Sequence, residues 1–183
     1  MAIGQFNLAN RQRAARKLLI TVAEWKEGTN TVREILGTRT EDSSIEYNAD
    51  IETMTDIRGI NYTDVNRTQP QQTFDPYLIL GGSRLGAFLN DVRRRNAVTE
   101  LNDFTIYIIT AFVGTAGAYE AEKHDGCTIA YTAIGGDANV NMPIDVYLSN
   151  DGLDNNGKST GAPIIGTVDK LSDDFTFSPT TVG

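Results

Sequence analysis

Residues 45–57 read Ile45-Glu46-Tyr47-Asn48-Ala49-Asp50-Ile51-Glu52-Thr53-Met54-Thr55-Asp56-Ile57, and polar residues alternate with less polar ones along the segment. Successive side chains of a β-strand point to opposite sides of a sheet. The alternation therefore predicts one strand about 43 Å long, at about 3.3 Å per residue. One of its faces would be acidic and would carry Glu46, Asn48, Asp50, Glu52, Met54 and Asp56. A solvated outer face of an antiparallel sheet is the simplest explanation of such a pattern.

Strand patterns also dominate the rest of the chain. Residues 18–25 and 31–39 are expected to pair across a turn, and Gly59 favours a hairpin into 60–68. Residues 104–113 are apolar on both sides, which predicts a central strand covered on both faces. Further strands are expected at 119–124, 128–134, 144–148 and 164–168, whereas Pro70 and Pro76 predict an irregular loop between them.

One helix is expected at about 83–95. Ser83 can cap its first turn, and Leu85, Phe88, Leu89 and Val92 follow the helical period. Three arginines, 93–95, complement the helix dipole at its end, although they could instead hold a partner's acids or a phosphate. The expected fold class is mainly β, an antiparallel sandwich or barrel-like fold with this one flanking helix.

Composition limits the function. The 183 residues suggest one domain, and the net charge of −8 argues against a protein that grips duplex DNA. Residues 1–17 form a basic arm with a charge of +4, which would dock on an acidic neighbouring copy or remain a solvated tail. Its charged residues are Arg11, Arg13, Arg16 and Lys17. Neither a signal peptide nor a membrane span is predicted, and a single cysteine, Cys127, fits a reducing cytoplasm.

The segment 41–77 carries a family resemblance. The runs Glu41-Asp42-Ser43-Ser44-Ile45 to Ile57-Arg58-Gly59, Tyr62-Thr63-Asp64-Val65-Asn66-Arg67-Thr68 and Thr73-Phe74-Asp75-Pro76-Tyr77 resemble the tail tube (major tail) proteins of long-tailed bacteriophages and related prophage tails. The resemblance is dense over about 35–95. It implies a β-rich tail tube domain over 1–183 that forms hexameric rings, stacked into a tube that conducts DNA. It also implies a tape measure protein and a tail terminator as partners, and a place in the virion after assembly in the host cytoplasm.

Several patterns suggest enzymatic or metal chemistry. Residues 152–159 fit the P-loop expression G-x-x-x-x-G-K-[ST], but a strand pattern follows where a phosphate-binding helix would have to begin. Weak cation binding at Asp151 and Asp154 stays open, although the loop misses the EF-hand register. His124 and Cys127 could suggest a thiol nucleophile with its base, but residues so close in a strand or turn rarely reach the required geometry. No catalytic residue, cofactor or metal site is therefore predicted.

Three classes of function remain: a structural tube subunit, a monomeric β-sandwich module for host or carbohydrate recognition, and a hydrolase using the acidic face. The tube subunit is favoured, because closing a ring of copies would satisfy the open sheet edges. In that case Glu46, Asn48, Asp50, Glu52 and Asp56 would line the lumen, where DNA slides past without specific binding. The less polar face of 45–57 would then bury against the 104–113 strand and the helix.

Overall fold

The computed structural model describes residues 8, 13–37, 40, 43–55, 57–136, 140–154 and 156–180, and only the backbone of residues 16, 64, 66 and 67. Its elements are η1 (Arg16–Leu18), β1 (Leu19–Glu27), β2 (Asn30–Ile35), β3 (Ile45–Glu46), β4 (Asp50–Thr55), β5 (Asn61–Arg67), β6 (Gln71–Phe74), α1 (Arg84–Arg95), η2 (Val98–Asn102), β7 (Phe104–Thr115), β8 (Ala118–Tyr131), β9 (Ile144–Tyr147), β10 (Ile164–Val168) and β11 (Phe177–Pro179). The fold is mainly β with one α-helix, as the sequence predicted.

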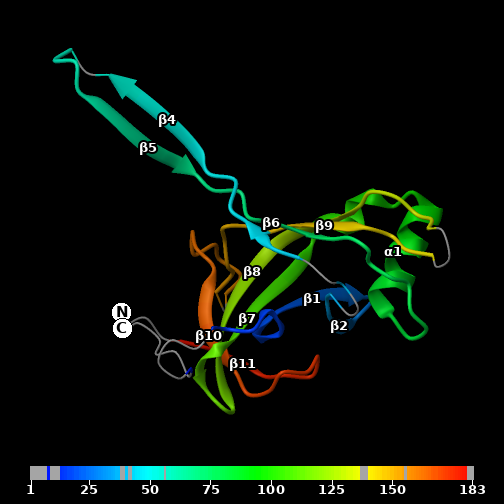
Figure 1. Ribbon diagram of the computed structural model, residues 1–183. Coiled ribbons are helices and arrows are strands. Elements are labelled where there is room, and N and C mark those ends of the chain that lie inside the picture. The colour runs from blue at the N-terminus through cyan, green and yellow to red at the C-terminus, as the bar shows by residue number, and fades with distance from the viewer. Residues whose placement is uncertain are drawn as a thin grey trace.

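The strands form two layers that share one long strand. The order along the sheet is β2-β1-β7-β8-β9-β6-β3, with β10 and β11 attached beside β8. The first part of β8 pairs with β7 and β10, and its last residues pair with β9. Figure 1 shows β6 and β9 crossing above β1, β2 and β7, with α1 at one side of the two layers. All pairings are antiparallel, and the sheet is not closed into a barrel.

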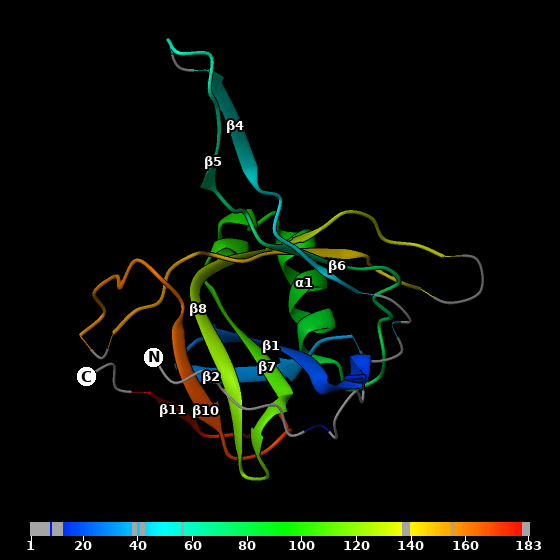
Figure 2. The same cartoon turned by 60° about the vertical axis from the view of Figure 1, so that its left-hand side comes forward.

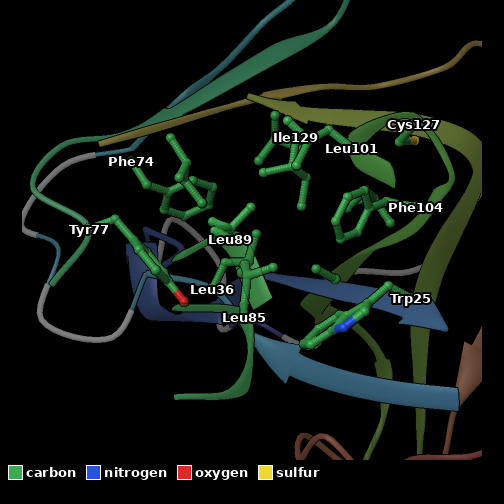
Figure 3. Close-up of a cluster of buried hydrophobic side chains, with 14 of the residues drawn as sticks. Trp25, Leu36, Phe74, Tyr77, Leu85, Leu89, Leu101, Phe104, Cys127 and Ile129 are labelled. Carbon is green, nitrogen blue, oxygen red and sulfur yellow. The ribbon is translucent and has the colours of Figure 1, made fainter. Parts of the chain in front are cut away.

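The main hydrophobic core lies between the two layers and α1. Trp25, Phe88 and Phe104 pack their rings at centroid distances of 5.9–6.2 Å. Leu85 and Leu89 of α1 are fully buried against this cluster, which Figure 3 shows in close-up. The predicted cap is also present, since the Ser83 hydroxyl accepts a hydrogen bond from the Gly86 N–H. The helix prediction is therefore confirmed in position, cap and buried face.

Strand β7 is covered on both faces, as predicted. Ile106 faces the main core, and Tyr107 and Ile109 face a second cluster on the other side of the sheet. The C-terminal segment covers this second cluster with Val168 and Phe175. Because Arg33 stacks 4.4 Å from the Phe175 ring and donates to the Phe175 carbonyl, β2 helps to hold that segment in place.

Two local predictions are wrong and one is confirmed. Residues 71–74 are not an irregular loop, because β6 pairs with β9 on one side and β3 on the other. Proline therefore bounds this strand without interrupting it. The two strands expected at 119–124 and 128–134 are the single strand β8, which turns from one layer to the other with Gly126 at a φ of +71°. The β1–β2 hairpin turns at Gly28 and Thr29, as expected.

Candidate functional site

The most prominent surface feature is a hairpin formed by β4 and β5, residues 50–67. It extends away from both layers in Figures 1 and 2, and its strands pair only with each other among the described residues. All six residues of β4 are exposed. A two-stranded hairpin without a covering layer is marginally stable in water. Packing within the described part of the chain therefore contributes little to the stability of this element.

The expected continuous strand over 45–57 is wrong. Asn48 has a φ of +35°, in the left-handed region that asparagine tolerates better than most residues. The chain turns there, so β3 pairs with β6 on the body while β4 pairs with β5 in the hairpin. A single left-handed residue interrupts the alternation that the sequence showed, and Glu46 does not share one continuous strand face with Asp50.

The two faces of the hairpin differ in charge. We call the face that carries Asp50, Glu52 and Met54 the acidic face; Glu52 lies in register with Asp64 there. The opposite face, which we call the neutral face, consists of the uncharged residues Ile51, Thr53, Thr55, Asn61, Thr63 and Val65. Its polar groups pair across the strands, Thr53 Oγ1 with Thr63 Oγ1 at 3.4 Å and Thr55 Oγ1 with Asn61 Oδ1 at 2.6 Å.

The hairpin exposes a concentration of apolar side chains. Ile51 and Val65 of the neutral face are 59% and 60% exposed, and Ile57 at the tip is fully exposed. The prediction that the less polar face of 45–57 buries against the 104–113 strand and the helix is therefore wrong for the hairpin residues, although Ile45 does pack against the main core. Because exposed apolar clusters of this kind mark interaction sites, the hairpin is the best candidate for a contact surface.

Specific hydrogen bonds fix the root of the hairpin to the body. The Gln69 N–H donates to the Tyr47 carbonyl at 3.1 Å, and the Asn48 side chain donates to the Gln69 carbonyl at 3.3 Å. The Asn150 side chain donates to the Thr68 carbonyl at 2.5 Å. Partial burial, and then the nearby carboxylate of Glu122, raise the pKa of Tyr47. These contacts set the direction in which the hairpin leaves the body.

The residues predicted to line a lumen divide between body and hairpin. Asp50 and Glu52 lie exposed in β4, whereas Glu46 lies exposed in β3. Asn48 forms the turn between them. Asp56 is outside the described residues. The structure thus brings Asp50 and Glu52 together and separates Glu46 from them.

The basic arm is described only in part. Arg13 and Lys17 are exposed, Arg16 begins η1 with only its backbone described, and Arg11 lies outside the described residues. Lys17 borders a hollow of about 390 Å³ beside Leu36 and Phe74. The two described cations therefore lie at the surface of the body.

The P-loop lookalike folds as a tight polar loop. β10 follows it, as the sequence predicted, and Leu153 bridges to Ser159. The Asp154 carboxylate accepts the N–H groups of Asn156 and Lys158, and the Asp151 carboxylate accepts those of Gly152, Thr160 and Gly161. These amides, which a phosphate would need, already bond to carboxylates. A hydrogen bond from the Ser159 side chain, followed by bonds from the backbone amides, lowers the pKa of Asp151. The backbone amides of Lys158 and Asn156 lower the pKa of Asp154.

His124 and Cys127 lie in β8, not in a turn, and do not form a nucleophile–base pair. His124 Nδ1 donates to the Ser149 carbonyl at 2.7 Å. Cys127 is fully buried, and its sulfur contacts the Ser149 N–H and the His124 carbonyl rather than the imidazole. Burial raises the pKa of the Cys127 thiol to about 11, so the reactive thiolate is scarce at neutral pH.

Two of the three terminal arginines of α1, Arg93 and Arg95, have partners within the chain. Arg95 bonds to Asp91 at 2.7 Å and to Glu100 at 2.8 Å, and Arg93 donates to Asn90. Among the described residues, no group of three or more His, Cys, Asp or Glu side chains is arranged to hold a metal ion.

Two residues with important contacts have no local sequence signal. Glu34 of β2 accepts the Arg84 and Leu85 N–H groups at 2.6 and 3.0 Å and thereby caps α1. Arg33 joins β2 to the C-terminal segment. Both contacts link residues far apart in sequence, so no local pattern could identify them. The Thr-x-Thr run at 53–55, in contrast, was a visible signal of an uncharged face.

No helix in the described part of the chain is long and apolar enough to cross a membrane. The comparison with known protein families finds no matching family model, and the comparison with curated proteins finds no match.

Proposed function

We propose that this protein is a structural subunit of a phage-type tail tube, which assembles through its hairpin into stacked hexameric rings. The observation that carries the proposal is the β4–β5 hairpin itself. It is an ordered pair of strands whose every β4 residue is exposed, and it has apolar side chains on both faces. Packing against neighbouring copies would cover it.

Open sheet edges support assembly as well. The seven-strand path ends at β2 on one side and at β3 on the other, and within the described part of the chain each of these strands pairs with one neighbour only. Unpaired strand edges are templates for pairing with another chain. A ring of copies would satisfy these edges, and the resemblance of residues 35–95 to tail tube proteins suggests the same arrangement.

The acidic face suggests how DNA would pass. In a ring, Asp50 and Glu52 from each copy would present carboxylates to DNA, which has one negative charge about every 1.7 Å of its axis. Screening limits this repulsion to about 8 Å, so the wall would act at contact. The subunit itself would be passive: it would not bind DNA specifically and would catalyse no reaction.

The partners and location follow from this proposal. A tape measure protein would occupy the tube during assembly, a terminator would stop its growth, and the completed tube would be part of the virion. A recognition module is less well supported, because Trp25, the only tryptophan, is 3% exposed and cannot provide an aromatic platform.

The test compares the full chain with a variant in which a short Gly-Ser turn replaces residues 50–67. Because the described residues of the hairpin contribute to neither buried cluster, the variant should keep the thermal stability of the parent. The parent should form rings or tubes in electron micrographs at high concentration, and the variant should remain monomeric in sedimentation. A parent that stays monomeric over a wide range of concentration and salt would refute the proposal.

A further inference from the structure

A second apolar surface lies on the body, beside β10 and β11. It is a groove of about 800 Å³, with Tyr107, Leu153, Pro163, Ile164 and Phe177 among its lining residues. Leu153 is 41% exposed, although the side chain is a large aliphatic one. We call this surface the C-terminal groove. Its apolar lining makes it suited to an uncharged occupant.

The charged groups around the C-terminal groove already have partners. Lys123 Nζ lies 3.0 Å from the Asp125 carboxylate, and Arg33 pairs with Glu24 while stacking on Phe175. The Asp154 carboxylate bonds to backbone amides of its own loop. An occupant therefore needs no charge of its own, and a charged one would lose hydration without gaining an unpaired counter-ion.

The neutral face of the hairpin matches these requirements. It presents Ile51 and Val65, and its threonine and asparagine side chains are hydrogen-bonded to one another across the strands. Burying such groups costs little, because their hydrogen bonds survive desolvation. The acidic face would have to bury Asp50 and Glu52, which is far more costly. The lower cost of burial therefore favours the neutral face of the hairpin as the occupant of the C-terminal groove.

The contact must join two copies. In both views the hairpin points away from β10 and β11 of its own chain, so it cannot fold back onto its own groove. Each copy carries one hairpin and one groove at different places on its surface. Such a contact is heterologous, and repeated heterologous contacts generate rings or filaments rather than closed dimers.

We propose that the neutral face of the hairpin of one copy packs in the C-terminal groove of a second copy, an inference that rests on the proposed self-assembly. The acidic face, with Asp50 and Glu52, then lies on the side of the hairpin that faces away from the groove, where the proposed channel would run. The neutral face of the hairpin would therefore bind a neighbouring copy, and the acidic face would form part of the channel wall.

Cross-linking between copies tests this packing. Ile51→Cys subunits are mixed with Leu153→Cys subunits, assembled, and treated with a short bis-maleimide before denaturing electrophoresis. The matched control is Met54→Cys, since Met54 is similarly exposed but lies on the acidic face. Cys127 adds no background, because it is fully buried. We expect cross-linked dimers with Ile51→Cys and at least about tenfold fewer with Met54→Cys.

A substitution within the groove provides the second test. Leu153→Arg places a charge on an exposed loop position, so folding should be unaffected while the concentration needed for assembly rises by about tenfold or more. Val98→Arg, at a 50% exposed position of η2, should assemble normally. Tubes that form without the Ile51–Leu153 cross-link, or that tolerate Leu153→Arg, would overturn the groove contact alone. A parent chain that never assembles would overturn the proposed function too.

Discussion

Glu34 shows how a single side chain can join three parts of this fold. One of its oxygens accepts the Tyr77 and Ser83 hydroxyls at 2.9 and 2.8 Å, and the other accepts two amides at the start of α1. A carboxylate at a helix N-terminus also interacts favourably with the helix dipole. The residue therefore anchors α1 to β2.

Replacing Glu34 by glutamine should lower the free energy of unfolding by about 1–2 kcal/mol, because the side chain keeps its size but loses its charge. For a chain of this length that corresponds to a melting temperature lower by about 2–8 °C. The control is Glu46→Gln, the same change at an exposed position. Equal melting temperatures for the two variants would show that the cap contributes nothing.

Asp151 should make the loop over 151–161 sensitive to acid. Its pKa is lowered in the folded chain, first by a hydrogen bond from Ser159 and then by backbone amides. A lowered folded-state pKa stabilises the protein above the unfolded value, and this contribution disappears as the pH falls through the folded value. Asp151→Asn should therefore melt below the parent at pH 7, and the difference should vanish at a pH below the folded-state pKa. Melting curves that differ equally at both pH values would contradict this.

At the scale of elements, the hairpin and the body differ in how much each contributes to the buried clusters. Every other long strand is paired on at least one side within the two-layer sheet and contributes to a buried cluster, whereas β4 and β5 contribute to neither cluster among the described residues. Local stability follows buried contacts. The hairpin should therefore open far more readily than β7 or β8 in the free subunit.

Hydrogen exchange can measure this difference. The amides of β4 and β5 should exchange rapidly in the monomer and become protected in assembled tubes, whereas those of β7 should be protected in both. Mass spectrometry of peptides covering 50–67 and 104–115 provides the comparison within one sample. A hairpin that is equally protected before and after assembly would mean that it is stabilised without neighbours.

Local sequence patterns predicted most of these elements, and their failures have physical causes. The double apolar pattern of 104–113 and the period of α1 are local signals that tertiary packing reinforced. The alternation of 45–57 could not reveal the turn at Asn48, because an asparagine in a left-handed conformation leaves the polarity pattern unchanged. The groove depends on β10, β11 and a loop meeting in space, which no local pattern encodes.

For the whole molecule, the distribution of charge matters most. The chain carries a net charge of −8, yet Arg13 and Lys17 lie exposed near its N-terminus. Two surfaces of opposite sign on identical subunits favour contacts between copies and set their relative orientation. In the proposed tube, the acidic hairpin face is therefore expected to affect the passage of DNA, and the basic arm is expected to affect assembly.

If Asp50 and Glu52 line a channel as proposed, reversing their charge should change how the assembled protein binds DNA. Asp50→Lys with Glu52→Lys should fold, because both positions are exposed, and the resulting tubes should retain DNA strongly at low salt and weakly at high salt. The control places the same two lysines at Asp103 and Asp173, which are exposed on the body. Gel retention over a salt series measures the effect; identical behaviour of the two variants would place Asp50 and Glu52 outside the channel.

Reversing the charge of the basic arm tests whether the arm contributes to assembly. Changing Arg11, Arg13, Arg16 and Lys17 to glutamate should leave the melting temperature unchanged and weaken polymerisation, more strongly at low salt where charges are less screened. Light scattering over a concentration series compares the variant with the parent. If both polymerise alike, the arm is a solvated tail.

The separation of the hairpin from both buried clusters also affects how this sequence can change over time. If the hairpin mediates assembly as proposed, substitutions within 50–67 should alter what the subunit binds without altering whether it folds, and substitutions in the core should do the reverse. Selection on folding and selection on partner choice thus act on different residues. Under the proposed function, changes in partner choice would arise through the hairpin while the body continues to fold as before.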